Sequence, residues 1–249
     1  MDRKVKFLVF TSILAALVIV LQYLGGIPLG PFSITLTLFP IVVGAVVLGP
    51  VPGLVLGLVF GVVVSILSLT GKDPGGQMIF AANPFLAWLL CLLKGAMAGY
   101  VPAVAFRGMK KFRYVNETAY ALTGVFLFLA GVFASRSLGT AGTGTKIAVT
   151  LICAVLAGAL LFGMYKLFNG NNAAYYIASI LAPICNTGIF IIFVSIFFRP
   201  VLSAWSNGSD LVVYVLTGLV GLNFIVEFAV SIVLAPAVAA IHKYGGRYL

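Results

Sequence analysis

The sequence predicts an all-α protein, a polytopic bundle of transmembrane helices. Of its 249 residues, 62% are hydrophobic and only 8% are charged, and the mean hydropathy is +1.20. A water-soluble domain of this size does not tolerate such a composition. Apolar runs of about the 20 residues that a helix needs to cross a bilayer recur from end to end. We therefore expect a single integral membrane domain over 1–249.

Eight spans are predicted from apolar length and from the Gly/Pro punctuation between the runs. Their expected positions are 7–24, 34–50, 53–70, 84–106, 118–135, 147–168, 174–198 and 211–241. The first run should remain as a helix, because it is long and no small-x-small signal-peptide cleavage site follows it. The fifth and sixth spans stay open to a second interpretation as a re-entrant pair, because their linker is rich in Gly and Thr.

The distribution of lysine and arginine predicts cytoplasmic termini. With the N-terminus inside, most basic residues fall on the cytoplasmic side, and the other side keeps only Lys72, Arg136, Lys146 and Arg199. This asymmetry follows the positive-inside rule, and an even number of spans brings both ends to that side. The net charge of +10 then reflects topology, because the basic residues are dispersed among loops without an aromatic-basic face for nucleic acid. We expect a multi-pass protein of the cell (plasma) membrane, in contact with lipid and without a nucleic-acid partner.

Small residues recur at helical spacing in the third and fourth spans. Gly53, Gly57 and Gly61 share one face of the third span, and Gly95 and Gly99 share one face of the fourth. In lipid, such stripes let two helix backbones approach closely. The expected role is packing inside the bundle.

A second stripe lies in the first span, where Thr11, Ser12, Ala15 and Ala16 give two overlapping small-xxx-small registers. From the spacing alone, this face serves either internal packing or the docking of another membrane protein. Both interpretations stay open at this point.

Charged and amide side chains are predicted near the middle of the membrane. At 1.5 Å of rise per residue, Lys94 lies roughly 15 Å and Asn186 roughly 18 Å along their spans, at a depth similar to that of Glu227. Asn223 precedes Glu227 by four residues and shares its helix face. Ionisable groups at this depth persist when they are paired or face a polar cavity.

Two interpretations of these residues remain open. In the first, they line a substrate pocket in which Lys94 meets an anionic group, Glu227 a cation or hydroxyl, and Asn186 and Asn223 supply amide hydrogen bonds. In the second, Lys94 and Glu227 form a structural ion pair. Asn83, before Pro84, is a further candidate for substrate contact and equally a helix start.

Nothing in the sequence predicts an enzyme. The chain has five acidic residues and a single histidine, His242, and it lacks HExxH, GxSxG and GxxxxGK[ST] motifs. We expect no metal and no cofactor bound by this chain, so that any use of ATP comes from partner subunits. Cys91, Cys153 and Cys185 lie in apolar runs without metal-ligand spacing and are interpreted as small buried residues.

Four stretches resemble the substrate-binding S components of energy-coupling factor (ECF) vitamin transporters. They are FTSILAALVIVLQYL, GPFSITLTLFPIVVGAVVLGPVPGLVLGLVFGVVVSI, NPFLAWLLCLLKGAMAG, and the pair ILAPICNTGIFIIFVSIFF and GLNFIVEFAVSIVLAPAVAAI, within about 1–106 and 174–242. The resemblance implies a six-helix core, to which this chain adds two helices, a predicted insertion at 112–172.

The resemblance also implies a function and partners. The protein would capture a vitamin or related micronutrient from outside and dock onto an ECF T component carrying two ATPase subunits. The positions that match the family's T-component motif are Thr11, Ser12, Ala15 and Ala16. The loop that would close over the pocket contains Gly25, Gly26, Pro28, Gly30 and Pro31, and its composition equally suits an ordinary turn.

Two other functions compete with this one. A self-sufficient secondary transporter or channel for a small organic solute is the main alternative, although no internal repeat supports it. An intramembrane enzyme is disfavoured because no nucleophile-base pair or metal cluster is visible. For the S component, one cation, one anion and two amides would suit a carboxylate-bearing ligand such as pantothenate, and riboflavin or folate remain compatible.

Overall fold

The structure is a computed structural model, and it describes residues 3–24, 27–29, 32–34, 36–110, 121, 124, 172–206 and 225–245. Within these ranges the chain is a bundle of eight helices with one short antiparallel strand pair. Five of the helices are long and apolar enough to cross a membrane. The predicted class, a polytopic helical membrane protein, is confirmed.

The long helices follow the predicted spans closely. They are α1 (Arg3–Leu24), α3 (Pro50–Leu69), α5 (Pro84–Met109), α8 (Ala173–Phe197) and α11 (Ile225–Gly245). The last span was expected from 211, and residues 207–224 lie outside the described part of the chain. The predicted spans at 118–135 and 147–168 also lie outside the described helices, so the insertion at 112–172 stays a prediction.

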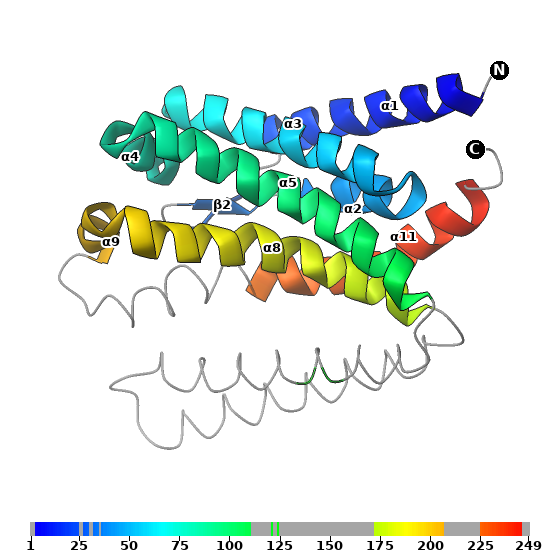
Figure 1. Ribbon diagram of the computed structural model, residues 1–249. Coiled ribbons are helices and arrows are strands. Elements are labelled where there is room, and N and C mark those ends of the chain that lie inside the picture. Colours follow the sequence, from blue (N-terminus) through cyan, green and yellow to red (C-terminus); the bar gives the residue numbers. More distant parts are fainter. Residues whose placement is uncertain are drawn as a thin grey trace.

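Three shorter helices depart from the predicted span pattern. The second span was expected over 34–50, but its helix, α2, comprises only Leu38–Val47. The chain also forms α4 (Pro74–Ala82) and α9 (Arg199–Ser206), which apolar length could not predict because each is shorter than a membrane crossing. α4 joins α3 to α5, α9 follows α8, and both short helices lie at the same end of the bundle (Figure 1).

The long helices lie roughly side by side along the bundle (Figure 1). α5 packs against α3 on one side and α8 on the other, while α11 packs against α8 and α2. α1 contacts α3 and α2 at the edge of the bundle. The start of α1 and the end of α11 lie at the same end, opposite α4 and α9 (Figure 1).

Two local signals explain where helices begin. Gly49 adopts a φ of 107°, which permits the tight turn between α2 and α3, and Pro50 then occupies the first turn of α3. At α5, the Asn83 side chain accepts a hydrogen bond from the Leu86 amide at 3.1 Å. Asn83 is therefore the N-cap of α5, in agreement with its interpretation as a helix start.

The glycine stripes of α3 and α5 meet backbone to backbone, in an interface that we call the glycine seam: Gly53 opposite Gly99, Gly57 opposite Gly95, and Gly61 opposite Cys91. A Cβ atom added to Gly57 would clash with the Gly95 carbonyl oxygen, and one added to Gly99 would clash with the Gly53 carbonyl oxygen. Internal packing, the expected role of these glycines, is confirmed.

The segment after α1 forms a β-hairpin, which the sequence analysis did not predict. Strand β1 (Ile27–Leu29) pairs antiparallel with β2 (Phe32–Ile34), with Pro28 opposite Ser33. The base of the hairpin is tied to the bundle, because the buried Thr37 donates a hydrogen bond to the Gln22 side chain at 2.9 Å. β2 also contacts α4.

Candidate ligand-binding site

Glu227 is a buried carboxylate in the first turn of α11. Its side chain is 7% exposed and accepts a hydrogen bond from the Thr187 hydroxyl of α8 at 3.1 Å. One turn further along α11, Ser231 donates its hydroxyl proton to the Glu227 backbone carbonyl at 2.8 Å. A carboxylate buried in the membrane is costly unless it has polar partners. The Thr187 hydroxyl supplies such a partner, so α8 and α11 contact each other here through polar groups.

Asn186, next to Thr187 on α8, belongs to the same cluster. Its side chain lies close enough to the Glu227 carboxylate to interact with it, while its own oxygen, Oδ1, is buried and has no hydrogen-bond partner among the described residues. A buried polar atom without a partner costs about 1–3 kcal/mol. The sequence analysis expected the two residues at a similar depth, and the structure brings them together; their role in substrate binding stays a prediction.

Lys94 has different surroundings. Its ammonium lies 5.2 Å from the ring centroid of Phe190 on α8 and 5.8 Å from that of Phe60 on α3. Both distances suit cation–π attraction, which offsets part of the cost of holding a cation in the membrane. Phe190 in turn stacks on Trp205 of α9 at 6.5 Å.

No salt bridge joins Lys94 to Glu227 or to any other residue in the described ranges. The ammonium still attracts the carboxylate across the bundle. The direct ion pair, one of the two sequence interpretations, is therefore not formed in this structure. Burial beside aromatic rings accounts for the difference, because the rings supply an alternative partner for the cation.

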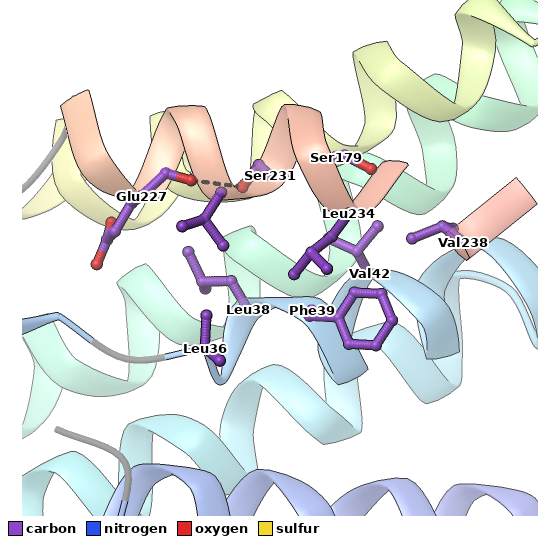
Figure 2. A pocket seen from close by; sticks show the side chains of 10 residues that line it. Leu36, Leu38, Phe39, Val42, Ser179, Glu227, Ser231, Leu234 and Val238 are labelled. Atoms are coloured by element: carbon purple, nitrogen blue, oxygen red, sulfur yellow. Dashed lines mark hydrogen bonds between the residues drawn. The ribbon is translucent and has the colours of Figure 1, made fainter. Parts of the chain in front are cut away.

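A small cavity opens beside Glu227, between α2, α8 and α11 (Figure 2). Its volume is about 20 Å³ for a water-sized sphere, roughly the space that one water molecule needs. Glu227 lies at one end of the lining and Val238 at the other, with Ser231 bonded to the Glu227 carbonyl between them (Figure 2). The described lining residues are Leu36, Leu38, Phe39, Val42, Ser179, Glu227, Val230, Ser231, Leu234 and Val238.

Ser179 supplies the second unsatisfied polar atom near this cavity. Its side chain is 3% exposed, lines the cavity from α8, and its hydroxyl has no hydrogen-bond partner among the described residues. Ser179 lies seven residues before Asn186, about two helical turns, so both can face the same side of α8. Two buried polar groups on α8, the Ser179 hydroxyl and the Asn186 side-chain oxygen, are therefore available to hydrogen-bond a ligand.

The structure adds three polar residues that the sequence analysis missed. Thr187 and Ser231 gave no distinct signal in an apolar run, because serine and threonine hydroxyls often donate to a backbone carbonyl of their own helix. Ser179 is equally inconspicuous in the sequence. The available signal was spacing, because Thr187 adjoins Asn186 and Ser231 follows Glu227 by one turn.

Two predicted substrate contacts are not brought into the cluster by the described structure. Asn83 caps α5 and is exposed, and a substrate contact for it stays a prediction. Asn223 lies outside the described residues, as do Gly25, Gly26, Gly30 and Pro31 of the expected lid. Pro28 lies in β1, so the described part of that loop is a strand pair, and its role as a lid stays a prediction.

The stripe on α1 divides into two halves. Thr11 and Ala15 are half-buried, and Ala15 packs against the core, whereas Ser12 and Ala16 are exposed. The Thr11 hydroxyl also donates a hydrogen bond to the Phe7 backbone carbonyl at 2.8 Å. Ser12 and Ala16 thus present the part of the stripe that another membrane helix can reach, and docking there stays a prediction.

Metal chemistry finds no support in the described ranges, where no group of three His, Cys, Asp or Glu side chains could hold an ion. Cys91 is buried and Cys185 half-buried, both as free thiols, while Cys153 is outside the described residues.

Comparison with known proteins gives one family. Residues 6–168 match the model of a family described as "ECF transporter, substrate-specific component". The match covers more than half of the chain and includes most of α1 and all of α2 to α5, whereas α8 and α11, with the polar cluster, lie beyond the matched residues. No curated protein matches the sequence.

Proposed function

Because the chain belongs to the family of ECF transporter substrate-specific components, we propose that it captures a vitamin or related micronutrient outside the cell. The family binds substrates for transport and is not a family of enzymes. The captured molecule would then enter the cell with the help of a T component and two ATPase subunits. ATP would be bound and hydrolysed by those partners, and this chain would bind no cofactor.

The polar cluster on α8 and α11 is the observation that carries this proposal. Glu227 and Asn186 are buried at membrane depth, and the Asn186 oxygen and the Ser179 hydroxyl lack partners. Such groups favour a polar ligand, because each hydrogen bond that they gain on binding removes part of the cost of their burial. The cavity beside Glu227 is the place where that ligand would begin to bind.

The proposed orientation follows from the arrangement of the helices. The start of α1 and the end of α11 lie at one end of the bundle (Figure 1). We place that end at the cytoplasm, in the plasma membrane, because Arg107 and Lys110 at the end of α5 add to the basic residues there. The hairpin, α4 and α9 would then face outside.

Uptake measurements test the proposal. Cells that express this chain with a T component and two ATPases should accumulate one radiolabelled micronutrient from a panel of vitamins. Uptake should stop when the T component is omitted or when the ATPases carry inactive nucleotide sites. Undiminished uptake by the chain alone would instead identify a self-sufficient transporter and overturn the proposal.

The docking surface can be tested separately with Ser12→Leu combined with Ala16→Leu. Both side chains are exposed on α1, so leucine there should block close approach of a partner helix without disturbing the bundle. Copurification with the T component should fall at least about tenfold, the effect of roughly 1.4 kcal/mol. Leu17→Phe, which adds bulk to an exposed position off the stripe, is the matched control. Equal copurification of both variants would exclude this surface.

A further inference from the structure

The polar groups around the cavity are mostly hydrogen-bond acceptors. Glu227 Oε2 accepts the Thr187 hydroxyl at 3.1 Å, and Ser231 has already donated its proton to the Glu227 carbonyl. Asn186 is not among the lining residues, but its partnerless atom is also an acceptor, the side-chain carbonyl oxygen. Among the described lining residues, Ser179 keeps a free proton to donate, and Figure 2 shows it away from Glu227. A ligand that satisfies the Glu227 end of the cavity must therefore bring donors.

Positive charge is missing from the described lining of the cavity. None of its residues in the described ranges is basic. Lys94, the nearby cation of the bundle, is held between the Phe190 and Phe60 rings at 5.2 and 5.8 Å. Its ammonium therefore does not supply an anion-binding group at the cavity wall.

The rest of the described lining is apolar. Leu36, Leu38, Phe39 and Val42 cover the side formed by α2 and the residues before it, and Val230, Leu234 and Val238 cover the side of α11. Figure 2 shows Leu36 and Leu38 across the cavity from Glu227, and Phe39, Val42, Leu234 and Val238 farther along it. The cavity thus has one acceptor-rich end and an apolar body, a pattern typical of sites in which a few polar groups orient a mainly apolar ligand.

We infer that the substrate is an amphipathic molecule that directs a hydrogen-bond donor toward Glu227, such as an ammonium, ring N–H, amide N–H or hydroxyl group, and that a carboxylate is rejected at this position. This inference rests on the proposed function and specifies its ligand. A donor finds acceptor oxygens on Glu227 and Asn186, whereas a ligand carboxylate, which can only accept, meets no basic residue in the described lining. Discrimination then comes from leaving these acceptors, and the ligand's own oxygens, without donors.

The ligand class differs from the one that the sequence alone favoured. A carboxylate-bearing molecule such as pantothenate was expected because Lys94 was counted as an anion-binding group of the pocket. The aromatic surroundings of Lys94 remove that reason. What remains at the cavity is Glu227 and its hydroxyl and amide neighbours.

Matched ligand pairs test the inference on the full-length protein, purified in lipid nanodiscs. The probes are nicotinamide with nicotinate, biotinamide with biotin, and panthenol with pantothenate, each pair differing at a carboxylate. Native mass spectrometry gives the dissociation constants and also identifies any small molecule that copurifies. In the pair that binds, the uncharged member should bind at least about tenfold more tightly.

Glu227→Gln should remove this preference, because an amide both donates and accepts. The two members of the pair should then differ by less than about threefold. Asp73→Asn is the matched control, because it removes a carboxylate from the loop before α4, away from the cavity. It should leave the preference as it is in the wild type.

The outcomes separate the inference from the function on which it rests. The inference is wrong if the protein copurifies with a carboxylate ligand, or if it binds the carboxylate member of a probe pair more tightly. It is also wrong if Glu227→Gln leaves the preference for the uncharged member unchanged. In each of these cases the S-component function still stands. If no probe binds, a copurified ligand that carries donors and no carboxylate supports the inference. If nothing binds, nothing copurifies and no uptake occurs with the T component and ATPases, the proposed function fails and the inference with it.

Discussion

The two helix interfaces on either side of the α5–α8 pair are filled in opposite ways. In the glycine seam, α3 and α5 meet through backbone atoms, and no side chain separates Gly57 from Gly95. Between α8 and α11, by contrast, Glu227, Thr187 and Asn186 meet, and a cavity opens beside them. The α3–α5 interface is tightly packed because its glycines have no side chains, whereas the α8–α11 interface is polar because of the side chains that it contains.

The difference teaches how a small membrane bundle can be rigid and still bind a ligand. Lipid is as apolar as leucine, so helices associate through close packing and through hydrogen bonds rather than through a hydrophobic driving force. The glycine seam is held by close packing and leaves no space for a ligand. The α8–α11 interface is held by hydrogen bonds, but Asn186 and Ser179 keep polar atoms without a partner among the described residues. These atoms remain available to a ligand.

The largest effect is expected from Gly57→Leu in the glycine seam. Any Cβ at this position clashes with the Gly95 carbonyl oxygen, so the two backbones must separate along the whole interface. Overpacking of this kind costs about 1–3 kcal/mol and occasionally more. The thermal midpoint in detergent should fall strongly, whereas Gly108→Leu, at a position with open space around it, should not lower it. Similar midpoints for both variants would show that the seam does not hold the bundle.

Thr187→Val should weaken the other interface by a smaller amount. The substitution keeps the shape of the side chain and removes the hydroxyl that donates to Glu227 at 3.1 Å. Loss of this hydrogen bond costs about 0.5–1.5 kcal/mol, and both stability and ligand affinity should decline. Thr70→Val is the control, because the Thr70 hydroxyl bonds only carbonyls of its own helix. An unchanged ligand dissociation constant in Thr187→Val would separate the Glu227 cluster from binding.

Tyr175→Phe probes the α8–α11 interface at its other end. The Tyr175 hydroxyl lies 2.7 Å from His242 Nδ1, and both rings pack near Phe106, at 4.8 and 5.4 Å. Phenylalanine keeps the ring contacts and loses the hydrogen bond, worth about 1 kcal/mol. Thermal stability should drop slightly without a change in ligand affinity, and Tyr100→Phe, at an exposed tyrosine of α5, should change neither. A loss of affinity in Tyr175→Phe would extend the binding region to this end.

Lys94→Met should have the smallest effect on ligand binding. The variant keeps the apolar stem and loses cation–π attraction of about 0.5–1 kcal/mol, while it also removes the cost of a charge in the membrane. Stability and affinity should each change by less than about 1 kcal/mol in binding titrations and thermal unfolding. A loss of affinity equal to that of Glu227→Gln would place the ammonium against the ligand and restore Lys94 to the site.

Much of the fold could be predicted from the sequence because the membrane imposes strict rules. A helix that crosses a bilayer needs about 20 apolar residues, and α1, α3, α5 and α8 therefore appear near their predicted positions. The short α4 and α9 and the β1–β2 pair could not be predicted in this way, because their lengths carry no such requirement. They depend on tertiary contacts, such as the hydrogen bond that Trp205 of α9 donates to the Met78 sulfur of α4 at 3.1 Å.

The candidate site was predicted in part. Glu227 and Asn186 stood out because charged and amide groups are rare in apolar runs. Their serine and threonine neighbours did not, because those residues are common in membrane helices and often bond their own backbone. The partner of Lys94 could not be predicted either, since Phe60 and Phe190 look like ordinary apolar residues of their spans.

By itself, the sequence determined the class of the protein, the positions of most membrane helices, the packing role of the glycine faces on α3 and α5, and the presence of buried charges. These follow from properties of single residues: apolar length, the lack of a side chain in glycine, and the cost of charge in lipid. Only the tertiary structure decided which groups meet. It separated Lys94 from a direct pair with Glu227 and brought Thr187 to the carboxylate, because partners on different helices depend on how those helices pack.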